Sequence, residues 1–403
     1  GQLEEIWQSI LLMQFHDILP GTAIAWVYKE VENRHAEITR ELLEIVNTSL
    51  AALANDPAAN TAPQALTANA MSVSRGGVAG LGVAVPSKLA RATSIVEQKE
   101  FVILENEELR VRVDRSGRIV SLFSLTTNRE AIAPGIAANE LHLHNDNPTR
   151  WDAWDIDEHY RNSKQVLDTV DEFSVRQEAD GTAVIETKRV LYSASQQAST
   201  IVQTIRLEPG AKSIDIGFEI DWHENEKLLK LAFPIDIHAE EVAAETQFGF
   251  VKRPTHENTS WDFARFESCQ HKYLFLNEKD WGVAFANDST YGFDVQRTTE
   301  ANGATVTSVR FSLLRSPKFP DPEADQGRHT LKFKIRPAAT IEDAVSLGYE
   351  LNYPAREVQG NRPVEPLVSS SAAQVVVETV KLAEDGSGDL IVRLYESTGG
   401  RAD

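Results

Sequence analysis

The sequence predicts a mainly β protein in which an N-terminal helical hairpin precedes a large antiparallel β-sandwich. Two hydrophobic patterns carry this prediction. Apolar residues recur at three- and four-residue steps from Leu3 to about Asn55, which is the period of an amphipathic helix. From Glu100 the period changes to two, and short apolar runs are separated by Gly, Asn, Asp and Pro, as in an antiparallel sheet. At 403 residues the chain is long enough for two or three domains.

The helical hairpin is predicted from two apolar stripes. The first stripe runs out into Asp17 before Pro20 and Gly21 end the helix, and its members are Leu3, Ile6, Ile10 and Met13. Thr22 is expected to cap a second, longer, antiparallel helix that ends near Asn55. Since two helices bury only one face each, we expect the hairpin to be part of a three-helix bundle.

The rest of the chain is expected to be β. The expected domains are a helical fragment at 1–55, a linker with a small β segment at 56–98, the large sandwich at 99–345, and a truncated β segment at 346–403. Runs with strand character are 109–113, 119–120, 183–192, 200–207, 213–222, 227–233, 282–286, 305–313, 330–335, 374–382 and 390–395.

Composition excludes several partners. Sixty acidic against forty basic residues give a formal charge of -20, which disfavours nucleic acids and anionic membranes and suits a neutral polyol. Cys269 is the single cysteine, so no internal disulfide can form, and this usage predicts a reducing compartment, the cytoplasm by default. No apolar run reaches the roughly eighteen residues of a membrane span.

His16 and Asp17 are the first candidate site residues, because they stand side by side at the end of the first predicted helix. A neutral imidazole is a common zinc ligand, but a histidine at a helix end is also often a simple hydrogen-bonding residue. The carboxylate of Asp17 could in the same way bind only local amides. The spacing alone therefore leaves both interpretations open.

A second candidate segment packs two indoles and three acids into seven residues: Trp151, Asp152, Trp154, Asp155 and Asp157. Indole faces stack on sugar C–H surfaces while carboxylates accept hydroxyl hydrogen bonds. Asp155 and Asp157 would share a face if the segment is extended. The alternative is a loop whose tryptophans plug the sandwich and whose acids are solvated.

Three other groups of polar residues are expected to have mainly structural roles. His142 and His144 could ligate a metal from one strand face, but such pairs are usually incidental. A polar and aromatic loop is expected to support an interface with another domain, with substrate contact as the alternative, and its members are Arg253, His256, Asn258, Trp261 and Asp262. Asp325, Arg328 and His329 lack a serine in a GxSxG context, which argues against a serine hydrolase triad.

The segment QFHDILPGT at 14–22 resembles the metal-ligand segment of the α-mannosidases of glycoside hydrolase family 38. Four further stretches look like family segments in the same order, and the resemblance extends over 3–400, weakest between 55 and 99. These stretches are WDAWDID at 151–157, RPTHENTSWD at 253–262, LRSP at 314–317 with PDPEADQG at 320–327, and RLYE at 393–396.

The resemblance implies a sandwich of the galactose mutarotase-like type and a retaining, zinc-dependent enzyme that removes terminal α-linked mannose from oligosaccharides. It implies that His16 is a zinc ligand and that Asp17 accepts a sugar hydroxyl, with Trp151, Trp154, Asp155 and Asp157 as further substrate contacts. In the family, the nucleophilic aspartate and the remaining zinc ligands lie in an N-terminal α/β domain that precedes this sequence. We therefore expect no catalytic residue in this chain, that domain as its partner, and no turnover by the chain alone.

Two expectations compete at the level of the isolated chain. One is the C-terminal part of an α-mannosidase, and the other is a non-catalytic carbohydrate-binding or scaffolding β-sandwich module. In the first case the helix face of Ile6, Ile10 and Met13 would lack its partner. Homo-oligomers formed through the N-terminal helices, or fraying of these helices, would follow from that exposed apolar area.

Overall fold

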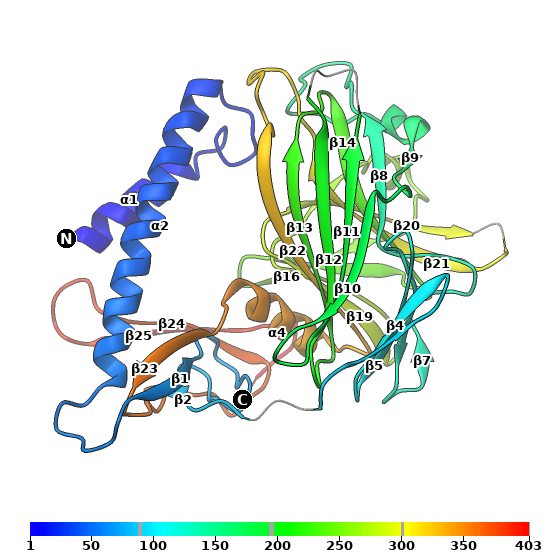
Figure 1. Cartoon of the computed structure of the whole chain (residues 1–403). Helices are drawn as coiled ribbons and strands as arrows, with labels where there is room; N and C mark the ends of the chain where they lie inside the picture. The colour runs from blue at the N-terminus through cyan, green and yellow to red at the C-terminus, as the bar shows by residue number, and fades with distance from the viewer. Residues whose placement is uncertain (88–90, 193–196, 300–301, 403) are drawn as a thin grey trace.

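The computed structural model describes residues 1–87, 91–192, 197–299 and 302–402, and it is mainly β, as predicted. Residues 88–90 of the expected linker and the terminal Asp403 lie outside the described residues. Figure 1 shows a tall sandwich of sheets on one side and a long helix standing beside it. The α-helices are α1 (Gln2–Met13), α2 (Ala25–Ala54), α3 (Ser260–Phe263) and α4 (Ile341–Asn352), and η1 (Glu158–Ser163) is a 3-10 helix.

The sandwich consists of antiparallel sheets, which we describe for the ranges given above. A nine-stranded sheet has the spatial order β10 (Glu172–Gln177), β11 (Ala183–Leu191), β12 (Ser199–Leu207), β13 (Ile214–Trp222), β22 (Gly327–Pro337), β19 (Trp281–Asn287), β18 (Tyr273–Glu278), β15 (Glu241–Thr246) and β16 (Gly249–Pro254). A six-stranded sheet has the order β17 (Ser268–Cys269), β20 (Gly292–Thr299), β21 (Thr305–Leu314), β14 (Lys227–Ile235), β8 (Glu140–Asn145) and β9 (Gln165–Val166).

Smaller sheets complete the β structure. Five strands precede the six-stranded sheet in the sequence and form a sheet in chain order: β3 (Ser94–Glu97), β4 (Phe101–Glu105), β5 (Leu109–Asp114), β6 (Ile119–Ser124) and β7 (Arg129–Glu130). A three-stranded sheet has the order β2 (Val83–Ala84), β1 (Gln64–Ala68) and β23 (Arg356–Gly360), and the last hairpin is β24 (Val375–Leu382) with β25 (Leu390–Glu396).

The main core lies between the nine- and six-stranded sheets. Strand β12 shows why the sequence folds this way, since every second residue from Ser199 to Leu207 is buried. Aromatic rings join the two layers: the ring centroids of Phe311 and Phe333 are 5.2 Å apart, and those of Phe233 and Phe285 are 5.5 Å apart. The period-two pattern of the sequence therefore corresponds to one face turned into this core.

Helix α4 was not expected from the sequence, and it packs on β18, β19 and β22 of the large sheet. Thr340 caps it through a hydrogen bond from the amide of Asp343, and the Asp343 carboxylate accepts from the Thr340 amide in return. The helix continues without a break through the expected domain boundary at residue 345. The domain boundaries themselves stay predictions.

Helices α1 and α2 form the predicted hairpin, but their ends differ from the expectation. Helix α1 stops at Met13, so His16 and Asp17 lie in the turns that follow it. Ile24 occupies the N-cap position of α2 without a side-chain hydrogen bond. The prediction that Thr22 caps α2 is therefore wrong, because its hydroxyl donates to the Asp17 carbonyl instead, at 3.3 Å.

The apolar face that α1 leaves exposed is not the one expected. The side chains of the expected face pack against α2 in a small core of Ile6, Ile10, Met13, Val31, Ile38, Leu42 and Ile45. On the neighbouring side of the helix, Leu3, Trp7 and Leu11 follow each other at four-residue steps and are 51%, 58% and 62% exposed. The sequence is apolar on both sides of α1, so periodicity alone could not decide which side meets α2.

We predict that the exposed stripe drives self-association of the chain. Trp7→Ser combined with Leu11→Ser should weaken association by about a hundredfold to a thousandfold, because burying each large apolar side chain is worth about 2 kcal/mol. Concentration-dependent light scattering checks this, with the exposed neighbour Gln8→Ser as the control. A parent chain that stays monomeric across the concentration range would contradict the prediction.

His144 of β8 is 1% exposed, and its Nδ1 lies 3.1 Å from the Tyr160 carbonyl oxygen. Within the described ranges its Nε2 has no hydrogen-bond partner. Burial lowers the pKa of this imidazole from its ordinary value near 6.5 to about 4. The folded protein therefore holds His144 neutral over a pH range in which the unfolded chain binds a proton.

We predict that His144 makes the sandwich lose stability as the pH falls from about 6.5 to about 4, because proton binding then favours the unfolded chain. The pKa difference corresponds to roughly 3 kcal/mol at most. Urea denaturation at several pH values should show a smaller loss for His144→Gln than for the parent. His35→Gln, an exposed site on α2, is the control, and an unchanged pH dependence in His144→Gln would contradict the assignment.

Candidate functional site

Loops from distant parts of the sequence meet at one end of the sandwich. They are the α1–α2 connection at 14–24, the segment 146–157 after β8, and the segment 315–326 between β21 and β22. Figure 1 shows the α1–α2 connection beside the upper end of β22.

Arg315 fixes the path of the tryptophan-bearing segment. Its Nε donates to Oδ2 of Asp146 at 2.6 Å, and Asp146 is only 3% exposed. Its Nη2 donates to the carbonyl oxygen of Asp155 at 2.6 Å, and its Nη1 to that of Ala153 at 3.4 Å. A planar guanidinium can serve such diverging acceptors at once, so the segment has little freedom to move.

Two carboxylates tie the same loops together. Oδ2 of Asp152 accepts from the amides of Lys318 at 2.7 Å and Phe319 at 3.1 Å. Oδ2 of Asp325 accepts from the amides of Arg315 and Ser316, both at 2.9 Å. Each carboxylate is therefore engaged in holding the backbone.

Trp151 and Trp154 point into solvent, with 65% and 62% of their surface exposed. The alternative in which both plug the sandwich is therefore wrong. Trp151 has a φ of 57°, and its carbonyl oxygen accepts from the amides of Trp154 at 2.7 Å and Asp155 at 2.8 Å. This tight turn replaces the extended segment that would have placed Asp155 and Asp157 on one face.

Asp155 and Asp157 do not line a cavity with the tryptophans. The Asp155 side chain is exposed, whereas its carbonyl is held by Arg315. The Asp157 carboxylate accepts from the amide of Thr149 at 2.6 Å and from its hydroxyl at 2.7 Å. These hydrogen bonds, that of the amide first, lower the pKa of Asp157 and occupy one of its oxygens.

His16 and Asp17 lie next to each other, as predicted from their position after the helix. The His16 side chain is 74% exposed, and its Nε2 lies 3.3 Å from Oδ2 of Asp17. The other oxygen of Asp17 accepts from the Thr22 hydroxyl at 3.4 Å. The Tyr28 hydroxyl lies 3.2 Å from the carbonyl oxygens of both Asp17 and Ile18, which fastens the turn to α2.

A cavity of about 410 Å³ brings part of the expected site together. Its lining residues are Asp17, Thr22, Trp151, Asp152, Ala153, Trp154, Phe319 and Pro320. A second cavity, of about 510 Å³, shares Ala153 and Trp154 with the first and is bounded by Tyr28, Arg315 and His329. His16, Asp155 and Asp157 line neither cavity.

The donor chemistry around His16 suits a zinc ion only in part. An exposed imidazole beside a carboxylate can supply two donors, whereas zinc usually takes four. Within the described ranges, no three His, Cys, Asp or Glu side chains come close enough to hold a metal ion together. His142 and His144 therefore do not complete a site with a third donor there.

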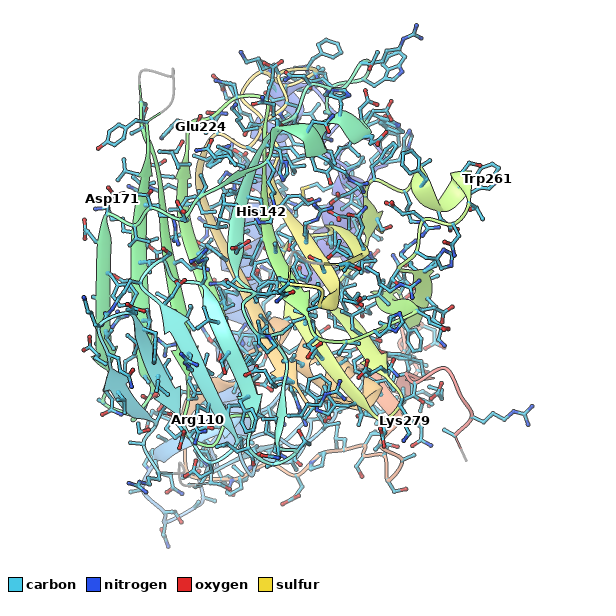
Figure 2. The ribbon with its side chains drawn as sticks, turned by 90° about the vertical axis from the view of Figure 1, so that its right-hand side faces the viewer. Arg110, His142, Asp171, Glu224, Trp261 and Lys279 are labelled. Atoms are coloured by element: carbon cyan, nitrogen blue, oxygen red, sulfur yellow. The ribbon has the colours of Figure 1, made fainter. Side chains whose placement is uncertain are left out.

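The loop around Trp261 lines neither cavity, whereas Asp325 and His329 line the larger one. In α3, Trp261 is 84% exposed, and Figure 2 shows it projecting from the edge of the molecule. Asp262 lies 2.8 Å from Arg265 and 3.5 Å from His256, so this loop is held by its own ion pairs. His329 Nε2 lies 2.8 Å from the carbonyl oxygen of Asp325, not its carboxylate, which excludes a triad with that acid.

Arg315, Phe319 and Tyr28 are site residues to which the sequence had assigned no role. Arg315 and Phe319 belong to the stretch around 314–327, where an arginine stands among prolines and acids. That density of turn residues and charge in a strand connection is the signal that could have indicated a functional loop. Tyr28 gave no such signal, because tyrosine is common on amphipathic helices.

Comparison with protein families shows which family the chain belongs to. The family model described as "Glycosyl hydrolases family 38 C-terminal domain" matches residues 104–323. "Alpha mannosidase middle domain" matches 1–53, and "Glycosyl hydrolases family 38 C-terminal beta sandwich domain" matches 374–403. The chain is therefore a member of glycoside hydrolase family 38, which confirms the resemblance found in its sequence.

Individual relatives agree with this membership. The chain is 34% identical to Alpha-mannosidase 2C1 of Homo sapiens over 443 aligned residues, which cover 100% of this chain and 41% of that protein. It is 29% identical to Alpha-mannosidase of Saccharomyces cerevisiae, covering 100% of this chain and 38% of the relative. The chain thus spans about two fifths of the length of these curated relatives.

A solved structure supports the fold. The crystal structure of an alpha-mannosidase from Enterococcus faecalis V583 superimposes with a TM-score of 0.72 at 13% identity, covering 98% of this chain and 58% of that one. In the described part of this chain, no helix has both the length and the apolar character that crossing a membrane requires.

We predict that Arg315→Ala destabilises the protein by about 3 kcal/mol, because it leaves the buried carboxylate of Asp146 without its cation. Arg315→Lys should lose less stability than Arg315→Ala, because lysine keeps the positive charge and lacks only the forked guanidinium that reaches Ala153 and Asp155. Urea denaturation measures both, with Lys318→Ala on the same loop as the control. A loss in Arg315→Ala no larger than in the control would show that Arg315 does not hold these loops.

Proposed function

We propose that this chain forms part of a zinc-dependent, retaining α-mannosidase that removes terminal α-linked mannose from oligosaccharides. The observation that carries the proposal is the cavity in which Asp17 meets Trp151 and Trp154, beside an exposed His16, in a chain of family 38. The names of the relatives support the same reaction, because the curated relatives described above are α-mannosidases.

The proposed role of the cavity is to bind a mannose ring. The indoles of Trp151 and Trp154 offer faces for the C–H surface of a pyranose, and their exposure leaves these faces accessible. Asp17 would accept a hydrogen bond from a sugar hydroxyl through the oxygen that does not face Thr22. Asp155 and Asp157 contribute less to this proposal, since neither lines the cavity.

His16 is proposed to hold zinc through a ring nitrogen. In the part of the chain that the structure describes, His16 and Asp17 are the donors at that point, and we propose that the remaining ligands come from a partner domain of the same protein. Zinc bound there would orient sugar hydroxyls and favour the distorted ring of the transition state. The exposed imidazole and the absence of a three-ligand cluster within the described ranges both fit a shared site.

The residues that cleave the glycosidic bond are proposed to lie outside this chain. A retaining glycosidase uses two carboxyl groups about 5 Å apart, one as nucleophile and one as acid and base. The carboxylates near the tryptophans are engaged in other bonds: Asp152 and Asp325 hold backbone amides, and Asp157 binds Thr149. An N-terminal catalytic domain is thus the proposed partner, and the stripe of Leu3, Trp7 and Leu11 offers it an apolar surface.

A cytoplasmic location is also proposed, because the chain has one cysteine, Cys269, which is exposed and free.

The second candidate function is a non-catalytic carbohydrate-binding module. It is favoured by the fact that the proposed sugar contacts lie within this chain, whereas a complete metal site does not lie in its described part.

The test is His16→Ala in a full-length protein that contains this chain. We predict that zinc retention measured by atomic absorption and hydrolysis of an aryl α-mannoside are both lost, while the sandwich keeps its circular dichroism spectrum, because the imidazole is exposed and its ring contact is with the half-exposed Phe15 next to it, outside the core. His35→Ala on α2 is the matched control.

The 403-residue chain alone should bind zinc weakly and should not hydrolyse the same substrate. Zinc-stimulated turnover by the chain alone, or full zinc retention in His16→Ala, would contradict the proposed division of the site. Mannoside binding without turnover, even in the full-length protein, would instead support the binding module.

A further inference from the structure

A second hollow lies on the outer face of the six-stranded sheet, away from the cavities described above. Because side chains alternate along a strand, two residues from each of four neighbouring strands lie on this face. These residues are Glu140 and His142 of β8, Ala232 and Pro234 of β14, Ser308 and Arg310 of β21, and Gln296 and Thr298 of β20. They line a cavity of about 760 Å³ that shares no lining residue with the candidate mannoside site.

The strand register explains why the sheet is hollow here. Ala232 stands opposite both Glu140 and Arg310, and Pro234 stands opposite Ser308. The central strand therefore presents short side chains between strands that carry long ones. Figure 2 labels His142 in the middle of this face.

The lining of this hollow is strongly basic. Among its described lining residues, Arg112, Arg118, Lys164 and Arg310 are cations, whereas Glu140 is the single acid. This concentration of positive charge stands in a chain whose formal charge is -20. A basic hollow on an acidic protein focuses a field that attracts small anions.

Only part of this charge is neutralised within the protein. Arg118 lies 2.8 Å from Asp114 and 3.5 Å from Glu140, and Arg310 donates to Asp294 at 2.8 Å. Arg112 and Lys164, in contrast, form no ion pair within the described ranges. The guanidinium of Arg112 lies 4.1 Å from the centroid of the Phe101 ring, which holds its plane in place.

Two buried polar atoms of this lining lack a partner in the described structure. His142 is 5% exposed, and its Nε2 lies 3.2 Å from the Glu140 carboxylate, but its Nδ1 has no hydrogen-bond partner there. The same holds for Nε of Arg112. Nε of Arg112 is a donor that an anion oxygen can satisfy, and Nδ1 of a neutral His142 whose Nε2–H faces Glu140 is an acceptor that a hydroxyl can satisfy.

We propose that this hollow binds a small phosphate monoester, of the hexose phosphate class. A phosphate carries close to two negative charges and three acceptor oxygens, which match Arg112 and Lys164, the two lining cations without an ion pair in the described structure, although the charge of Lys164 also acts on Glu140. Gln296 and Ser308 add polar groups suited to sugar hydroxyls, and the volume lies within the range of small-molecule sites. The site is separate from the proposed hydrolytic function and does not depend on it.

Calorimetric titration of the chain with glucose 6-phosphate, inorganic phosphate and glucose tests this proposal. We expect glucose 6-phosphate to bind more tightly than inorganic phosphate, and glucose not to bind. Arg112→Gln and Lys164→Gln should each weaken the binding of glucose 6-phosphate about tenfold, because each removes a charged contact to the phosphate.

The matched control is Arg110→Gln, which removes the same charge from the same strand, β5, outside the hollow. Arg110 pairs with Glu105, and Figure 2 shows it near the lower end of the molecule, well away from His142. The control should bind like the parent. Because Lys164 is exposed, Lys164→Gln leaves the fold intact even if Arg112→Gln alters the stacking on Phe101.

The proposal would be overturned if neither glucose 6-phosphate nor inorganic phosphate bound. It would also be overturned if Arg110→Gln and Lys164→Gln weakened the binding of glucose 6-phosphate equally, because such a result would show only a general effect of surface charge. Binding of inorganic phosphate that glucose 6-phosphate cannot match would overturn the hexose phosphate class. Binding of glucose as tight as that of its phosphate would overturn the role of the cations.

Discussion

The largely buried ion pair between Arg315 and Asp146 is the interaction on which the candidate site depends. A guanidinium withdrawn from water needs acceptors in several directions, and Arg315 finds them in one carboxylate and in the backbone carbonyls of Ala153 and Asp155. The turn that exposes Trp151 and Trp154 follows from this arrangement. The shape of the proposed sugar-binding face thus depends on backbone carbonyls of the tryptophan-bearing segment, to which Arg315 donates from the neighbouring loop.

The same principle divides the acidic residues of this end of the molecule. Asp152, Asp157 and Asp325 each use Oδ2 to accept two hydrogen bonds from the loops, from backbone amides and from the Thr149 hydroxyl. Asp17 differs, because its two oxygens face side chains, the Thr22 hydroxyl and the exposed His16. An oxygen that accepts two hydrogen bonds from a loop holds the path of that loop, whereas an oxygen that faces an exposed side chain is accessible to a ligand.

The sequence predicted the parts of the fold in which one face of an element is buried. Strands such as β12 and β13 alternate cleanly, and the alternation marked them. It missed α4, whose capping box at Thr340 was its clearest sequence signal, and it chose the wrong exposed side of α1, which is apolar on both sides. The role of Arg315 could not be predicted, because its partners, the Asp146 carboxylate and backbone carbonyls, lie about 160 to 170 residues away in the chain. Backbone acceptors leave no pattern in a sequence.

Helix α2 is attached at both ends, and it therefore connects the three-stranded sheet rigidly to the turn of Asp17. At its C-terminus the Ala54 carbonyl accepts from the amides of Asn361 and Arg362 beside β23, and near its N-terminus Tyr28 holds the turn of Asp17. Its 30 residues span about 45 Å, so a tilt of only about two degrees at the small sheet displaces the other end by about 1.5 Å. A displacement of that size is enough to misalign a reacting group. Substitutions in β1 or β23 can therefore change the geometry of a sugar site that none of their atoms approaches.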